Sequence, residues 1–447
     1  MAGDMSALPG MLCASLTVRQ SKDFSVSRAN HEGDLAIPAK ALPARVILSV
    51  IRWRREDQPW EAAIPVKHLA MTVAAAAATA AVSALAAPVP TAAAWHPGGP
   101  AALPAPAIQR LSDAQLAGQR VIYSYPGPTP PRALLRAVRS GQAAGVIFFA
   151  GNISSPAQLA AVARQLQRAD ASKRNPVRAP LLLMADQEGG AVRRLPGPPD
   201  LSEKQIGQAA DPPAQARQAG LGAAATLHSA GLNVNLAPVL DVYRAAGDFI
   251  DQYGRSYGSA PGQVARLGAD FIWAQQRAGV AGAAKHFPGL GAAARKQDTD
   301  LRPVTLTVRS STLRWLDEQP YRAAIAAGVR LVMVSWAVYP ALDGHRPAGL
   351  SPRVVQGELR QRLGFQGVTI TDGLEAGALR RYGTIADRGQ RAALAGMDLL
   401  LCAGHSVGEG QRAAAGLARA YRDGLLSRAS GEAAVTRIAA LRASLPG

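Results

Sequence analysis

Two charged side chains follow an apolar run in the middle of the chain. The run 280–284 leads directly into Lys285 and His286, and a proline and a glycine then interrupt the extended pattern. Two carboxylates, Asp298 and Asp300, come shortly afterwards. This pattern is typical of a buried strand that delivers a cation and an imidazole to its end and is followed by an acidic loop. Such groups can bind a polar substrate or transfer protons.

Similar apolar runs elsewhere in the chain end in, or are closely followed by, a residue that could meet a ligand. A single capping aspartate or a hydrogen-bonded core histidine would need no function. Polar or aromatic groups at five consecutive run ends are harder to explain by core packing, because polar residues are mostly exposed. We therefore predict a common site. The residues at the other run ends are Asp186, Asp241, Trp336 and Asp372.

These residue types suit the binding and cleavage of a polyhydroxylated substrate. Glycoside hydrolysis requires one carboxylate near the anomeric carbon and a second group that protonates the leaving oxygen. A metal site is disfavoured, because the acids stand singly and without the H-E-x-x-H or EF-hand spacing. Lys285 is an alternative candidate for a Schiff base, because a desolvated lysine can lose its proton. We expect neither a metal nor an organic cofactor.

Eight short apolar runs, separated by helix-forming segments, must position these groups. Runs of this kind are typical of strands that are buried on both faces of a parallel sheet. Helices are predicted at 212–230 and 261–278, each followed by a glycine that ends it. The predicted strands are 121–125, 146–150, 181–186, 233–239, 281–287, 331–336, 368–372 and 399–403.

Eight strand–helix alternations predict an α/β fold, a TIM (β/α)8 barrel that forms a single catalytic domain over residues 110–447. In such a barrel the carboxyl ends of all strands meet at one face, which would bring the predicted site residues together. A doubly wound open sheet is the alternative. No G-x-G-x-x-G motif follows an early strand, so dinucleotide binding has little support.

Composition narrows the class of protein further. Apolar residues make up 48% of the 447 residues, which suffices for a large core. Cys13 and Cys402 are the only cysteines, which excludes a disulfide scaffold and a Cys-rich metal site. The net charge of +18 could attract an anionic cell-wall surface, although scattered arginines are also typical of a solvated surface. No nucleic-acid-binding motif is present, and nothing fixes the oligomeric state.

The N-terminal part reads as a leader and not as part of the barrel. Residues 1–66 form an extension that is either disordered or upstream of the true start. Residues 67–94 combine a basic flank, an apolar run and A-x-A sites, which predicts a secretory signal peptide. The apolar run could instead persist as a signal-anchor, since about 20 residues span a bilayer. A Pro/Ala linker is predicted at 95–109, and the protein is expected to be secreted or associated with the cell wall.

Five sequence segments in this order resemble glycoside hydrolase family 3. The first, D-Q-E-G-G with Arg194, is similar to the D-x-E-G-G-x-V-x-R segment of the family. Because the chain ends at Gly447, soon after the last predicted strand, the resemblance is to the single-barrel β-N-acetylhexosaminidases. The segments are 186–190 with Arg194, 231–241, 254–258, 285–289 and 371–372.

The resemblance implies a retaining mechanism that removes terminal β-linked N-acetylglucosamine, or a related β-sugar, from glycans such as peptidoglycan fragments. The residue at the Asp372 position is then the nucleophile that forms a covalent glycosyl-enzyme. The same resemblance implies that five residues bind the sugar hydroxyls. We predict two further residues, at the ends of apolar runs, as substrate contacts. The five are Asp186, Arg194, Arg255, Lys285 and His286, and the two additions are Asp241 and Trp336.

The predicted acidic loop departs from the family pattern. The single-barrel enzymes carry an Asp-Ser-His dyad there, whose histidine is the acid/base, whereas this chain has Asp298-Thr299-Asp300. Asp298 is retained, and Asp300 replaces the histidine. Asp300 can serve as the acid if its environment raises its pKa from about 3.9. The alternatives are another acid or a sugar-binding barrel with little or no turnover.

Overall fold

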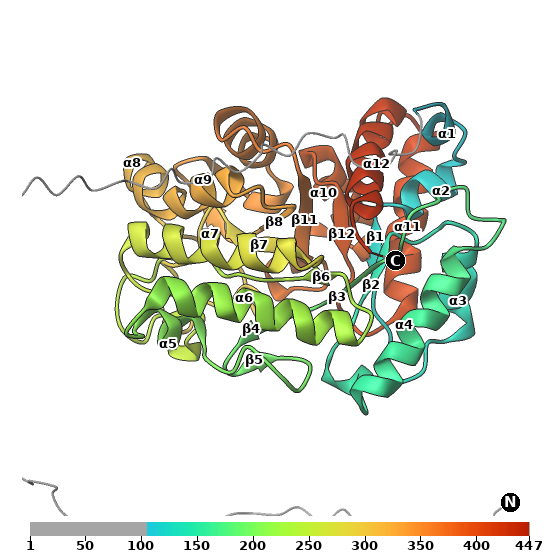
Figure 1. Ribbon diagram of the computed structural model, residues 1–447. Coiled ribbons are helices and arrows are strands. Elements are labelled where there is room, and N and C mark those ends of the chain that lie inside the picture. Colours follow the sequence, from blue (N-terminus) through green and yellow to red (C-terminus); the bar gives the residue numbers. More distant parts are fainter. Residues whose placement is uncertain (1–104, 447) are drawn as a thin grey trace, which may run out of the picture. The chain divides into compact units, whose positions relative to one another are not determined.

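The computed structural model describes residues 105–446, and all of them belong to one compact unit (Figure 1). Eight parallel strands close into a barrel in the order β1-β12-β11-β8-β7-β6-β3-β2. This confirms the predicted (β/α)8 fold, and each predicted strand range overlaps one barrel strand. The strands are β1 (Val121–Tyr123), β2 (Gly145–Ile147), β3 (Leu182–Ala185), β6 (Val234–Asn235), β7 (Ala281–Phe287), β8 (Leu331–Val334), β11 (Val368–Gly373) and β12 (Leu399–Leu401).

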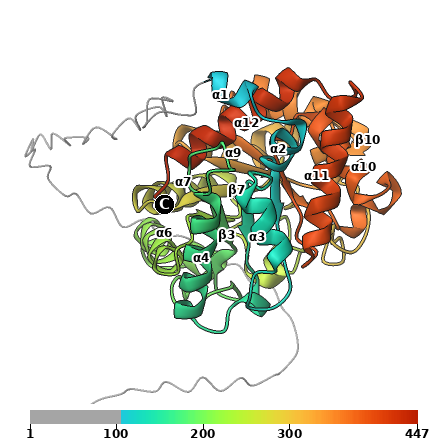
Figure 2. The ribbon, with the colours of Figure 1, turned by 90° about the vertical axis from the view of Figure 1, so that its right-hand side faces the viewer.

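Helices surround the strands on the outside of the barrel (Figures 1 and 2). Ser155 caps the helix that follows β2, since its Oγ accepts a hydrogen bond from Gln158 N at 3.1 Å. The helices are α1 (Ala105–Gln109), α2 (Asp113–Gly118), α3 (Arg132–Arg139), α4 (Pro156–Asp170), α5 (Glu203–Gly207), α6 (Pro212–Ser229), α7 (Pro261–Arg277), α8 (Ser310–Thr312), α9 (Gln319–Ala326), α10 (Ile385–Ala395), α11 (Val407–Arg422) and α12 (Arg428–Ala443).

Shorter elements connect the barrel strands and the helices. Two hairpins lie outside the barrel, and η5, one of the elements between β8 and β11, is a π-helix. The remaining elements are the hairpins β4 (Gln187–Gly189) with β5 (Val192–Arg193) and β9 (Val338–Tyr339) with β10 (Asp343–Pro347), and the turns η1 (Ala150–Asn152), η2 (Asp251–Tyr253), η3 (Leu313–Asp317), η4 (Ala348–Leu350), η5 (Arg353–Arg362) and η6 (Gly377–Tyr382).

Alternation along each strand sorts the apolar side chains into two clusters. In β8, Leu331 and Met333 belong to a small cluster inside the barrel, whereas Val332 and Val334 belong to the large cluster that packs against the helices. Successive residues of a strand point to opposite faces, so both faces of each barrel strand are buried. This explains why the strands read as continuous apolar runs in the sequence.

One predicted boundary is wrong, and others lie outside the described residues. The sequence predicts a linker at 95–109, but the described part, Ala105–Gln109, forms helix α1. Ile108 is 2% exposed and packs in the large apolar cluster, so the compact domain includes this helix. The extension at 1–66 and the signal at 67–94 fall outside the described residues. Within 105–446, no helix is long and apolar enough to cross a membrane.

Candidate active site

A cavity of about 470 Å³ opens at the carboxyl ends of the barrel strands. Its apolar floor consists of four residues that also belong to the cluster inside the barrel. They come from the ends of β2, β6, β8 and β12, which alternate with the remaining strands around the barrel. In TIM barrels, each interior layer takes four side chains from alternate strands, so this floor is the top layer of the core. The floor residues are Ile147, Leu236, Met333 and Leu401.

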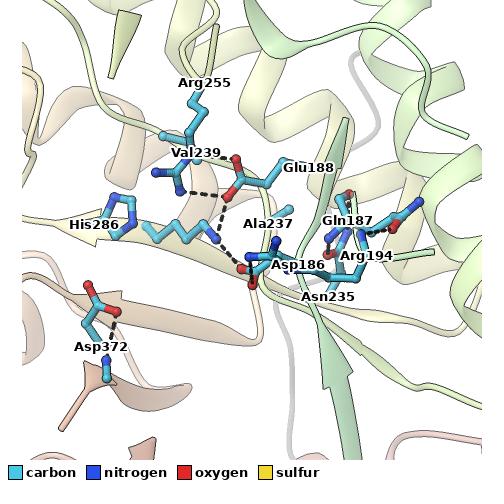
Figure 3. Close-up of polar contacts among 12 residues, drawn as sticks. Asp186, Gln187, Glu188, Arg194, Asn235, Ala237, Val239, Arg255, His286 and Asp372 are labelled. Carbon is cyan, nitrogen blue, oxygen red and sulfur yellow. Dashed lines mark hydrogen bonds and ion pairs between the residues drawn. The ribbon is translucent and has the colours of Figure 1, made fainter. Parts of the chain in front are cut away.

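Five charged residues on one side of the cavity form a connected ion cluster. Lys285 Nζ lies 2.8 Å from Asp186 Oδ1 and 2.6 Å from Glu188 Oε1. Arg255 donates two hydrogen bonds of 2.8 Å to the Glu188 carboxylate, and Arg194 Nη2 lies 3.3 Å from Asp186 Oδ2. Figure 3 shows these contacts converging on the two carboxylates. All five residues line the cavity, so the cluster presents fixed charges to a ligand.

The cluster keeps its members charged. Burial alone would lower the pKa of Lys285, but the carboxylates of Asp186 and Glu188 outweigh it and raise that pKa. Burial alone would raise the pKa of Glu188, but Arg255 and Lys285 hold it well below its usual range. The pKa of Asp186 is lowered in the same way, since Lys285 and Arg194 outweigh its burial. These groups therefore act as permanent hydrogen-bond donors and acceptors for hydroxyl groups.

His286 lines the cavity next to the cluster, and Asp241 holds it from behind. The Nδ1 atom of His286 lies 2.8 Å from Asp241 Oδ2. A carboxylate only accepts, so Nδ1 donates this bond. Asp241 Oδ1 also accepts from Leu290 N at 2.6 Å. Asp241 is fully buried and does not line the cavity, so its predicted role as a substrate contact is corrected to that of a positioning residue.

Asp372 and Asp300 meet at the same cavity from different elements. Asp372 lies near the end of β11, and Figure 3 shows it apart from the contacts of the ion cluster. Asp300 is an exposed residue at the rim, on the loop that follows β7. The neighbouring Asp372 carboxylate, and after it partial desolvation, raise the pKa of Asp300 to about 6. A carboxyl group whose pKa is raised in this way can act as a general acid.

Two further predicted residues do not reach the cavity. Asp298 Oδ1 accepts from Asp300 N at 2.9 Å, so this carboxylate shapes the loop instead of meeting a ligand. Trp336 is fully buried, and its Nε1 donates to the carbonyl of Gly373 at 2.8 Å. An indole that large fills space behind strand β11. The predicted substrate contact at Trp336 is therefore wrong in placement, and the residue supports the backbone next to Asp372.

Sequence reasoning missed Glu188 as a site residue. It stands in the D-Q-E-G-G segment, two positions after Asp186, and residues two apart point to the same side of an extended chain. That spacing was the signal that could have identified it. The hairpin β4–β5 that carries it is fixed by Gln187, whose Oε1 accepts from Arg194 N and Leu195 N, both at 3.1 Å.

A second, less charged side of the cavity was also not predicted. Phe149, after β2, and His405, after β12, lie with ring centroids 4.3 Å apart. Glu375 lies beside them, and its Oε2 accepts from Ala403 N at 3.2 Å. Partial desolvation, and after it Glu409, raise the pKa of Glu375 to about 8. All three residues follow strands, but their loops carry no recognisable motif.

Comparisons with known proteins agree with this geometry. Residues 114–441 match the family described as Glycosyl hydrolase family 3 N terminal domain. An uncharacterized secreted glycosyl hydrolase of Arthroderma benhamiae is 44% identical over 345 residues, which cover 77% of this chain and 97% of the fungal one. A β-hexosaminidase of Nitrosomonas eutropha is 34% identical over 264 residues, covering 58% of this chain and 72% of its own.

Solved structures show the same barrel. A glycoside hydrolase family 3 β-N-acetylglucosaminidase from Paenibacillus sp. FPU-7 aligns with a TM-score of 0.70 and 33% identity, over 75% of this chain and 62% of that one. A β-N-acetylhexosaminidase from Beutenbergia cavernae aligns with a TM-score of 0.64 and 31% identity, over 74% and 97% of the two chains. The chain therefore belongs to glycosyl hydrolase family 3 and is a glycosidase that resembles the β-N-acetylhexosaminidases of that family.

Proposed function

We propose that this glycosidase removes terminal β-linked N-acetylglucosamine, or a closely related β-sugar, with retention of configuration through a covalent intermediate on Asp372. The observation that carries the proposal is the pairing of Asp372 with Asp300 at one cavity, where the first acid raises the pKa of the second to about 6. A retaining glycosidase needs one carboxylate that attacks and one carboxylic acid that donates a proton.

The reaction follows in two steps. A carboxylate oxygen of Asp372 attacks the anomeric carbon while the bond to the leaving oxygen breaks, and protonated Asp300 gives its proton to that oxygen. A glycosyl ester of Asp372 results. Asp300, now a carboxylate, removes a proton from water, which attacks the anomeric carbon and releases the sugar. Asp372 is then a free carboxylate, and Asp300 carries a proton again.

The ion cluster holds the sugar in place during both steps. Asp186 and Glu188 present acceptors, and Arg194, Arg255 and Lys285 present donors, within the cavity that Asp372 lines. His286 adds its second ring nitrogen, because Asp241 holds the first. Hydrogen bonds to charged groups are worth about 1.5–3 kcal/mol each, so a few hydroxyl contacts suffice to orient the sugar ring.

The substrate class and location come from the relatives. The bacterial relatives are β-hexosaminidases, which supports an amino-sugar glycoside such as a peptidoglycan fragment as substrate. The fungal relative is a secreted glycosyl hydrolase, which supports an exported protein and agrees with the signal expected at 67–94. The basic net charge of +18 would favour adsorption to an anionic wall.

Other reactions fit the site less well. A Schiff-base mechanism needs a neutral lysine, but Lys285 lies in two ion pairs that raise its pKa. Phosphorolysis is disfavoured, because the carboxylate of Asp300 would repel a phosphate that approaches the glycosyl-enzyme. A barrel that only binds sugar would not need a second acid placed beside the nucleophile.

Aryl glycosides of several sugars test the proposal on the full chain. We expect nitrophenol release from the N-acetyl-β-glucosaminide, and loss of at least about 10⁴-fold in kcat for Asp372→Ala. Asp423→Ala, at the exposed end of α11, is the matched control and should retain activity. A 5-fluoro-glycoside should label Asp372, detected as a glycosylated peptide by mass spectrometry. No turnover on any aryl glycoside, or a label on another residue, would overturn the proposal.

A further inference from the structure

The loop that carries Asp300 is docked onto the segment that follows the nucleophile strand. Gly377 N donates to Asp300 O at 2.7 Å, and Ala378 N donates to Thr299 O at 3.0 Å. Both donors belong to η6, which begins five residues after Asp372. Each hydrogen bond is directional, so the two backbone hydrogen bonds together fix both the distance and the orientation of the loop relative to η6.

The loop itself is compact. Asp298 Oδ1 accepts from Asp300 N at 2.9 Å, and Asp298 O accepts from Arg302 N at 3.1 Å. Thr299 is 4% exposed, so the loop is packed down at the point of contact. Asp300 therefore lies on a turn that is closed by hydrogen bonds within the loop. The direction of its side chain depends on where that turn is docked.

Only glycine fits at the docking point. A Cβ atom on Gly377 would lie 2.2 Å from Leu301 O, 2.4 Å from Leu301 C and 2.9 Å from Asp300 O. These are backbone atoms, which cannot rotate aside as a flexible side chain can. A side chain at position 377 would therefore push the acid loop away from η6.

We propose that Gly377 is a positioning residue that docks the acid loop, so that one continuous segment carries the nucleophile on β11 and places the acid beside it through η6. This rests on the proposed roles of Asp372 and Asp300. It goes beyond them by assigning the alignment of the two acids to a backbone contact instead of to a side chain.

The electrostatics of Asp300 supply a readout of the docking. Asp372 and Asp298 raise the pKa of Asp300 through their negative charges, and His286 and Arg255 lower it. Asp372 is the largest cause of the raised value of about 6. If the loop moves away from β11, the influence of Asp372 weakens and the pKa of Asp300 falls toward its ordinary value of 3.8. A role of Gly377 in stability alone would not shift this pKa.

Gly377→Ala tests the docking, and Gly357→Ala is the matched control. A Cβ on Gly357, in η5, would meet nothing within 4 Å. We expect Gly377→Ala to lower kcat by about 10²-fold, the cost of misplacing a catalytic group by about 1 Å. The alkaline limb of its kcat/KM profile should move from about 6 to lower pH, while the affinity for N-acetylglucosamine stays within about twofold. Gly357→Ala should match the wild type.

A second variant tests the docking if Gly377→Ala does not fold. Ala378→Pro removes the N–H that binds Thr299 O, and proline is tolerated in the first turn of a helix. It should show a smaller loss of kcat in the same direction, and thermal unfolding reports whether either variant is folded. The docking proposal is wrong if Gly377→Ala folds and keeps the wild-type kcat and alkaline limb. If Gly377→Ala does not fold, the same result for Ala378→Pro contradicts the proposal.

Asp300→Ala separates this inference from the proposed function. If Asp300→Ala loses activity and azide restores it, Asp300 is the acid, and the glycine variants then decide whether Gly377 positions it. If Asp300→Ala keeps full activity on a poor leaving group, the assignment of the acid fails, and the docking has no catalytic purpose.

Discussion

Arg255 binds Glu188 through two hydrogen bonds of 2.8 Å, from Nε to Oε2 and from Nη2 to Oε1. Glu188 is 1% exposed and also lies 2.6 Å from Lys285 Nζ, so one buried carboxylate contacts two cations. The fork of the guanidinium matches the carboxylate plane, which fixes both groups at once. Glu188 thereby determines where Arg255 and Lys285 stand when a sugar enters.

Removing Glu188 should destabilise the fold. Glu188→Ala leaves Lys285 and Arg255 short of a counter-charge in a buried site, and breaking a buried pair costs about 3–5 kcal/mol. Urea unfolding measures this difference. Glu432→Ala is the control, because its salt bridge with Arg428 (3.0 Å) is partly exposed, and such pairs are worth at most about 1 kcal/mol. Equal losses in the two variants would show that the ion cluster adds no stability.

The pH dependence of activity should report Asp300. Its pKa is raised from 3.8 to about 6, so the acid stays protonated up to about pH 6 and loses its proton above. Activity should therefore be high below pH 6 and fall as the pH rises through that value. Asp300→Ala should lower kcat/KM by about 10²–10⁴-fold on an alkyl glycoside and abolish the alkaline limb. On a dinitrophenyl glycoside, whose leaving group needs no proton, the loss should be small.

An unchanged alkaline limb in Asp300→Ala would contradict this assignment. The Asp372 carboxylate is the largest cause of the raised pKa of Asp300. For that reason Asp372→Asn is a useful companion variant. It removes the charge that raises the pKa of Asp300, and direct titration of Asp300 by NMR should then give a value below about 6.

The buried indole of Trp336 should matter for turnover more than for binding. Its hydrogen bond to Gly373 O supports the residue that follows Asp372. Trp336→Phe leaves that carbonyl without its partner, at a cost of about 1–3 kcal/mol. We expect kcat to fall by about tenfold or more, with KM nearly unchanged. Trp315→Phe, at a residue that is 74% exposed, is the control and should behave as the wild type.

Stability at alkaline pH should depend on Glu375. Its pKa is raised from 4.5 to about 8 in the folded protein, so the folded state binds this proton more tightly than the unfolded chain. The Glu375 carboxyl group therefore contributes its full stabilisation of the folded protein below about pH 4.5, and this contribution is lost as the pH rises through about 8. Glu375→Gln should flatten the fall in Tm between pH 5 and 9. Because Glu375 is exposed, solvent screening should keep the effect modest.

A Glu375→Gln protein whose Tm falls with pH as steeply as the wild type would count against this role. Glu432→Gln provides the surface control, since its carboxylate is partly exposed and pairs with Arg428 on α12. Glu409→Gln offers a second route to the same result. It removes the neighbouring carboxylate that contributes to the raised pKa of Glu375.

The barrel could be predicted because its strands are short apolar runs between capped helices. Both faces of each strand are buried, as for Leu331 and Val332, so the hydrophobic signal is continuous. Asp186, Lys285 and Asp372 could be placed because they directly follow such runs. Helix α1 was missed because a Pro/Ala-rich segment carries little periodicity, although Ile108 is buried.

Residues that act through loops or through burial could not be placed from the sequence. Asp241 and Trp336 stand at strand ends, but whether a strand-end side chain turns into the cavity or away depends on the last dihedral angles. Asp298 looks catalytic in the sequence because it stands at the aspartate of the family's dyad, yet it accepts a backbone N–H of its own loop. The docking of Asp300 onto Gly377 joins segments some 77 positions apart, and no local pattern reports such a contact.

The neighbouring carboxylates of Asp300 and Asp372 determine which small molecules can block the cavity. Above pH 6, the rim carries two negative charges where an imidazole would leave one. A protonated iminosugar, whose ring nitrogen carries a positive charge, then gains from both acids. Its affinity should increase as the pH rises through about 6, until the iminosugar itself loses its proton. The affinity of an inhibitor with a neutral ring would not depend on pH in this way. A protonated iminosugar could therefore inhibit this enzyme selectively over a glycosidase whose acid is a histidine.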